Sequence, residues 1–134
     1  VPNIYAIHKS LGVLAGLFLV LRLILRVRFG APKLPESLKK YEQKLAHLVH
    51  CGMYVTMLSV PLAGYLLSVY AGRGVELFGF PLPSLVSANQ DWREVWGEAH
   101  EAGAGILAVL IGLHVAGIAK HLVLEKINLL KRMW

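Results

Sequence analysis

The chain has 134 residues, of which 56% are hydrophobic; its mean hydropathy is +0.56 and its formal net charge is +6. A soluble domain of this size cannot bury so many apolar residues in long runs, so the composition excludes one and predicts a membrane protein. The single cysteine, Cys51, excludes an internal disulfide.

The first predicted span covers about residues 4–28, where an uncharged block is followed by Arg22 and two further arginines. Arginine stems can snorkel toward water, so the apolar length is adequate for a membrane span. Gly12 and Gly16 form a GxxxG pattern, and Gly12 lies one helical turn from His8. This face can closely approach a neighbouring helix or a flat ring, and simple helix packing explains the glycines equally well.

Two more spans and two loops complete the predicted chain. Residues 29–44 are polar and contain two prolines and several lysines, which predicts a loop. Residues 45–70 hold no charged side chain, which is a strong transmembrane signal, although Pro61 should kink the helix. Residues 71–95 are rich in glycine, proline, serine and asparagine and predict a structured loop outside the membrane. The third span covers about residues 96–122.

The distribution of basic residues predicts the orientation of these spans. Seven Lys and Arg residues lie between Arg22 and Lys44, two lie in the loop at 71–95, and four follow from Lys120 onward. By the positive-inside rule, the first loop and the C-terminal tail are cytoplasmic, and the 71–95 loop lies outside. His121, next to Lys120, is expected to be solvated at the inner surface. The excess basic charge therefore reflects topology and lipid contact, and argues against nucleic-acid binding.

Histidines inside the predicted spans suggest ligands at two depths. His100 and His114 are fourteen residues apart, so on an α-helix they share a face to within about 40° and lie about 21 Å apart along the axis. That distance is most of a hydrocarbon core of about 30 Å. His8 lies near the outer end of the first span, at the depth of His100. Ionisable residues at such depths are costly and point to function, although hydrogen bonds between packed helices would also explain them.

Histidines at matched depths favour haem over zinc. Zinc sites usually draw on three or four ligands, often Cys or carboxylate, whereas haem iron needs two axial ligands and a slot for a flat ring. Helices lined by glycine provide such a slot. The sequence therefore predicts a membrane electron carrier that binds haem, with His8, His100 and His114 as metal ligands.

Three further residues are candidates for cofactor binding near the inner side. His47 and His50 open the second span at the level of His114 and share a face, so they could be interfacial groups, propionate-binding groups or ligands. Arg22 lies fourteen residues after His8 and is therefore expected at the depth of an inner cofactor. There it could pair with a haem propionate or simply snorkel to the surface.

Six short segments resemble those of one known family. They are IHKSLG in the first span, LAHLVH and SVPLAGYLLS in the second, FGFPLP in the loop, and HEAGAG and GLHVAGIAKH in the third. With His8, His100 and His114 in the same order and spacing, the chain resembles the bacterial cytochrome b561 family over essentially its whole length. In that family four helices bind two b-type haems with bis-histidine ligation. The resemblance implies that His8 and His100 ligate an outer haem b and that His114 ligates an inner one.

The family's first helix, which carries the second ligand of the inner haem, has no counterpart in this sequence. We therefore expect an all-α membrane protein whose three transmembrane helices are part of a four-helix haem-binding bundle, with the missing helix supplied by a longer form of the same chain. A three-helix chain would instead need a second subunit in a homo-oligomer, or His47 or His50, to complete the inner site.

The resemblance also implies a function. By resemblance, we expect a multi-pass protein of the bacterial inner membrane that passes electrons from a small-molecule or protein donor to a quinone. Some family members oxidise superoxide and pass the electron to ubiquinone, so we expect a haem b oxidoreductase that uses quinone. Two alternatives stay open at this point. One is a cytochrome b subunit of a larger hydrogenase or dehydrogenase complex, and the other is a haem-free membrane scaffold whose histidines only pack.

Overall fold

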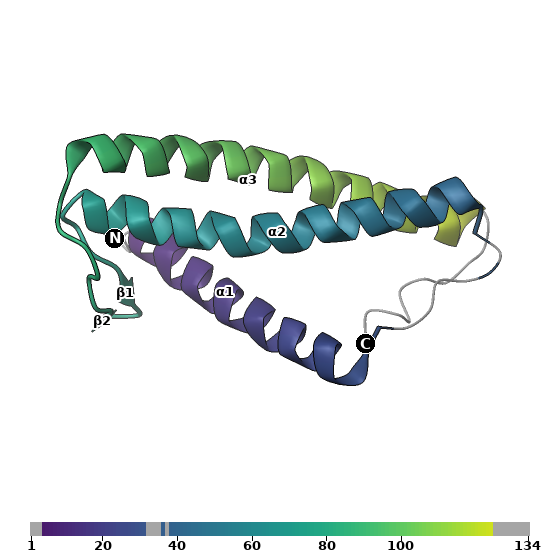
Figure 1. Cartoon of the computed structure of the whole chain (residues 1–134), viewed down its shortest axis with the longest axis horizontal. Coiled ribbons are helices and arrows are strands. Elements are labelled where there is room, and N and C mark those ends of the chain that lie inside the picture. Colours follow the sequence, from purple (N-terminus) through teal and green to yellow (C-terminus); the bar gives the residue numbers. More distant parts are fainter. Residues whose placement is uncertain (1–3, 32–35, 37, 125–134) are drawn as a thin grey trace.

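Three long α-helices make up the computed structural model, which describes residues 4–31, 36 and 38–124. They are α1 (Ile4–Phe29), α2 (Lys40–Tyr70) and α3 (Gln90–Ala119), and a five-residue π-helix, η1 (Lys120–Leu124), continues α3 (Figure 1). All three α-helices are long and apolar enough to cross a membrane. Their number and order agree with the three predicted spans.

The last two helices begin earlier than their apolar runs predict, because capping contacts lie upstream. The Glu42 carboxylate accepts a hydrogen bond from the Lys39 backbone N–H at 3.1 Å, and α2 begins at the residue after Lys39. Asn89 Oδ1 accepts one from the Trp92 backbone N–H at 3.1 Å, and α3 begins at the residue after Asn89. Such contacts satisfy N–H groups that a helix start leaves unpaired. The loop expected at 71–95 is therefore shorter at its C-terminal end.

The helices α2 and α3 run antiparallel and pack along their length, whereas α1 starts beside α2 and diverges from it toward its own C-terminal end (Figure 1). Glycine allows the close contact of α2 with α3, because a Cβ on Gly103 would lie 2.8 Å from Val60 Cγ2. The helix α1 meets α2 where a Cβ on Gly16 would lie 3.7 Å from Pro61 Cβ. The bundle is therefore a tight helix pair with a third, splayed helix.

Most large apolar side chains face outward. Phe18 on α1 is 67% exposed and Leu48 on α2 is 68% exposed. In a bilayer such surface contacts lipid tails, which are as apolar as the side chains themselves. The exposed surface is therefore that of membrane helices and not of a soluble bundle.

The loop between α2 and α3 contains a small hairpin. Strands β1 (Glu76–Leu77) and β2 (Phe80–Pro81) pair antiparallel, and the turn residues Phe78 and Gly79 have φ values of 48° and 90°. Positive φ at both central residues is typical of a type I′ turn, whose twist matches that of the flanking strands. Glycine adopts such a φ without strain, which explains its place at the second position.

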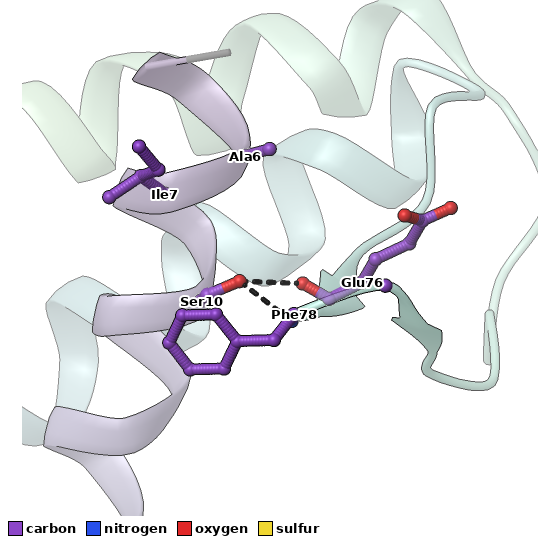
Figure 2. Close-up of a pocket in the computed structure, with 6 residues that line it drawn as sticks. Ala6, Ile7, Ser10, Glu76 and Phe78 are labelled. Carbon is purple, nitrogen blue, oxygen red and sulfur yellow. Dashed lines mark hydrogen bonds between the residues drawn. The ribbon is translucent and has the colours of Figure 1, made fainter. Parts of the chain in front are cut away.

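Ser10 on α1 fastens this hairpin to the bundle. Its Oγ donates a hydrogen bond to the Glu76 carbonyl oxygen at 3.2 Å and accepts one from the Phe78 N–H at 3.0 Å, as Figure 2 shows. Ser10 itself is buried, with 3% of its surface exposed. The hairpin is therefore held only two residues along α1 from His8.

Candidate functional site

His8 on α1 and His100 on α3 meet near the end of the bundle that carries the hairpin. Their ring centroids are 6.1 Å apart, and their ring planes are nearly perpendicular, at 81°. Since a metal–imidazole bond is about 2 Å long and the ring centre lies about 1 Å behind the nitrogen, two imidazoles on opposite sides of one metal have centres about 6 Å apart. The observed spacing matches that arrangement.

A backbone contact orients the His100 ring. Its Nδ1 lies 2.8 Å from the Val60 carbonyl oxygen on α2. A carbonyl only accepts hydrogen bonds, so the proton of the neutral ring is assigned to Nδ1. The lone pair is then on Nε2, the nitrogen left to bind a metal, and a hydrogen bond of this kind accompanies almost all metal-ligating histidines.

Gly64 gives the His100 ring its space. A Cβ at this position would lie 2.9 Å from His100 Cε1 and 3.1 Å from its Nδ1. The ring therefore packs against the α2 backbone, and a larger residue at position 64 would displace it. The sequence does not single out Gly64 or Val60, because their part depends on the register between α2 and α3.

His50 on α2 and His114 on α3 form a second pair of rings toward the other end of the bundle. Their ring centroids are 5.3 Å apart, with 65° between the ring planes. This is slightly closer than the spacing of about 6 Å for two imidazoles on opposite sides of a metal. His47 is exposed, and its Nε2 lies 3.6 Å from Cys51 Sγ. The structure therefore brings His50, and not His47, into contact with His114.

Two arginines and a tyrosine lie beside the His50–His114 pair. Arg26 Nη1 donates a hydrogen bond to the Tyr54 hydroxyl at 3.0 Å, and its guanidinium carbon lies 5.1 Å from the ring centroid. Arg22 lies beside the same hydroxyl. The sequence points to Arg22 alone. Spacing is the signal that could have identified the other two. Arg26 lies one helical turn after Arg22, and Tyr54 lies one turn after His50.

An ion pair joins α2 to η1 at the end of the bundle opposite the hairpin. Lys120 Nζ lies 2.8 Å from Glu42 Oε1, and the Glu42 side chain is only 7% exposed. The expectation that His121 is solvated is wrong. It is buried, because the π-helical turn of η1 places it near the Glu42 carboxylate.

The whole sequence matches one known family. A family model described as prokaryotic cytochrome b561 matches residues 1–134. The chain belongs to the prokaryotic cytochrome b561 family. Cytochrome b561 proteins are helical membrane proteins that transfer electrons and bind b-type haem. Family membership therefore confirms the predicted all-α membrane fold, the electron-transfer function and the binding of b-type haem.

Three relatives are similar to this chain over most of their length. Cytochrome b561 homolog 1 of Escherichia coli strain K12 is 29% identical over 126 residues, which cover 94% of this chain and 72% of the relative. Cytochrome b561 homolog 2 of the same strain is 29% identical over 128 residues, which cover 95% of this chain and 68% of the relative. A probable superoxide oxidase CybB of Yersinia pestis is 26% identical over 133 residues, which cover 98% of this chain and 76% of the relative.

The histidine pairs fit the haem of a cytochrome b561. Each level of the bundle brings together two imidazoles, which is the number of axial ligands that a bis-histidine haem takes. Within residues 4–31, 36 and 38–124, no group of three His, Cys, Asp or Glu side chains gathers around one point. At the outer level, the ring spacing and the protonation of His100 both suit ligation of an iron from two sides.

Proposed function

We propose that the chain carries electrons across the bacterial inner membrane through two b-type haems, the outer one held between His8 and His100. The observation that carries this proposal is the 6.1 Å spacing of the two rings, which leaves the room that an iron with two axial imidazoles needs. The Nδ1 contact of His100 supports it, because the nitrogen that would bind the iron is then unprotonated.

The inner haem belongs, in this proposal, at His114. This residue lies fourteen positions after His100, which is about 21 Å along a helix and spans most of the membrane. Its second ligand is either His50, whose ring is 5.3 Å away, or a histidine on a further helix, as the family resemblance implies. His47 lacks this contact with His114.

When bound, haem b supplies one-electron chemistry, with its iron alternating between ferric and ferrous states. His8 and His100 would hold the iron from two sides, and a haem held in this way would suit electron transfer better than oxygen binding. Val60 and Gly64 hold the His100 ring in one orientation, which would keep this ligand in place during electron transfer. A rigid ligand set suits fast electron transfer.

A quinone is the proposed acceptor. Family membership supports a membrane electron-transfer role, and a Yersinia pestis relative is named probable superoxide oxidase, which makes superoxide the first donor to test. A catalytic subunit that co-purifies with the chain would instead identify a cytochrome b subunit of a larger dehydrogenase or hydrogenase. Family membership argues against a haem-free scaffold.

The proposed orientation places the hairpin outside the cell membrane and the Glu42–Lys120 ion pair at the cytoplasmic side. It rests on the seven basic residues between Arg22 and Lys44, which the positive-inside rule assigns to the cytoplasm. The outer haem site then faces the donor, and the C-terminus is cytoplasmic.

Haem content tests the proposed function. Purified protein should show the α-band of a b-type haem in a reduced-minus-oxidised spectrum, and His100→Ala should remove about half of the bound haem, because an axial ligand is lost at one of two sites. His47→Ala is the matched control, since His47 lies in a span but outside both ring pairs, and it should keep the full content. An unchanged haem content in His100→Ala would contradict the proposal.

A further inference from the structure

Tyr54 lies with two arginines at the level where α1 diverges from α2. Arg26 donates a hydrogen bond to its hydroxyl at 3.0 Å, and Arg22 lies beside the same oxygen. Among the described residues, no carboxylate lies within ion-pair distance of either guanidinium. Two positive charges inside a membrane span are costly without a counter-charge, so they indicate a negatively charged partner.

The Arg26 side chain makes a contact with α2 that simple snorkelling does not require. The helices α1 and α2 meet at Gly16 and Pro61, where a Cβ on the glycine would lie 3.7 Å from the proline Cβ. From that contact, Arg26 is ten residues or about 15 Å along α1, whereas Tyr54 is only seven residues or about 10.5 Å along α2. Because α1 diverges from α2 beyond this contact (Figure 1), part of the distance along α1 is lateral, and Arg26 and Tyr54 lie at similar levels. The guanidinium therefore reaches across to α2, a contact that snorkelling toward water does not require.

These side chains adjoin the inner histidines. Tyr54 follows His50 by one turn on the same face of α2, and the His50 ring is 5.3 Å from that of His114. A planar guanidinium binds a carboxylate through two parallel N–H bonds, and a phenol hydroxyl can donate one more. The three groups therefore suit an oxyanion that belongs to whatever His114 binds.

We infer that Arg22, Arg26 and Tyr54 together bind a propionate carboxylate of the haem ligated by His114. The inference rests on the proposed function of His114 and adds the residues that set the reduction potential of that haem. Nearby positive charge favours ferrous over ferric iron, so loss of a guanidinium lowers the midpoint potential, and an unpaired propionate lowers it in the same direction. The phosphate of an anionic lipid is an oxyanion too and is the competing source.

Redox titration of the full, haem-loaded chain in phosphatidylcholine nanodiscs tests the inference. Arg26→Gln should shift one of the two midpoint potentials to a more negative value and leave the other unchanged, with haem content preserved. Tyr54→Phe should shift the same potential in the same direction by less, because it removes a hydrogen bond and no charge. Arg28→Gln is the matched control. Its guanidinium lies over the Phe29 ring, 5.7 Å from the centroid, so both potentials should stay unchanged.

Three results would overturn the inference. Equal shifts in Arg26→Gln and Arg28→Gln would show that charge acts only at long range. A shift that appears only in nanodiscs containing phosphatidylglycerol would assign the site to a lipid phosphate. Unchanged potentials in Arg26→Gln with full haem content would show that the haem carboxylate does not contact these groups.

His114→Ala separates this inference from the proposed function. If His114→Ala loses one haem while Arg26→Gln leaves both potentials unchanged, the ligand proposal stands and only the propionate site is overturned. If His114→Ala retains both haems, the proposed inner haem site is itself overturned, and the propionate site with it.

Discussion

The outer and inner histidine pairs differ in what holds them. His100 is oriented by a backbone carbonyl and by the absence of a side chain at Gly64, and the hairpin is fastened to α1 close to His8. The inner pair lies where α1 has left α2, and the long side chain of Arg26 reaches across to α2. Backbone contacts hold a ligand in place whatever is bound, whereas long charged side chains need their counter-charge. Under the proposed function, the fold organises the outer site, whereas the inner site would need its cofactor for completion.

Removal of His50 should break the inner pair and leave the outer pair intact. We expect His50→Ala to release the inner haem far more readily than the outer haem, because His50 contacts His114 directly. His47→Ala should behave like the unmodified protein. Complete loss of one haem, measured as the haem-to-protein ratio, identifies His50 as the second ligand, and partial loss assigns that ligand to a further helix. Equal losses of haem in His47→Ala and His50→Ala would show that contact with His114 does not matter for haem retention.

A methyl group at Gly64 should damage only the outer pair. The added Cβ would lie 2.9 Å from His100 Cε1, and overpacking of this kind costs about 1–3 kcal/mol, so the outer haem should be held roughly tenfold less tightly. Haem transfer to apomyoglobin measures the effect. Gly105→Ala is the control, because a Cβ there meets nothing within 4 Å. Equal haem retention in the two variants would show that Gly64 does not position the ring.

The depth of the histidines could be predicted from the sequence, and their local surroundings could not. The fourteen-residue spacing of His100 and His114, with His8 near the outer end of its own span at the depth of His100, is enough to expect partners at two levels. The contact of Gly64 with His100 depends on the register of two packed helices, which no local pattern in the sequence encodes. The Arg26–Tyr54 contact depends in the same way on where α1 crosses α2.

The details of the loop and of the helix ends could not be predicted from the sequence either. The composition of residues 71–95 predicts a loop, but the hydrogen bonds that fasten the hairpin to Ser10 join residues 66 and 68 positions apart in the sequence. The helix α3 begins at Gln90, before its apolar run, because the Asn89 cap and not hydrophobicity decides where it starts. The predicted span limits were based on runs of apolar residues, and such runs do not reveal where a side chain caps a helix.

Loss of the Ser10 hydroxyl should loosen the hairpin with the smallest effect on haem. Ser10→Ala leaves the Phe78 N–H and the Glu76 carbonyl oxygen without this partner, at a cost of about 1–3 kcal/mol. Hydrogen exchange at the Phe78 amide should become roughly tenfold faster. Ser59→Ala is the control, since its Oγ bonds only to carbonyls of its own helix. Release of the outer haem in Ser10→Ala would mean that the hairpin, and not α2, organises the outer site.

Electron paramagnetic resonance of the ferric protein tests the central claim most directly, which is that His8 and His100 fill both axial positions of one iron. Two imidazoles whose planes are nearly perpendicular, as the 81° angle indicates, should give a strongly anisotropic low-spin signal. His8→Ala should convert that signal to a high-spin one while the inner haem stays low-spin. A low-spin signal that survives unchanged in His8→Ala would contradict the account.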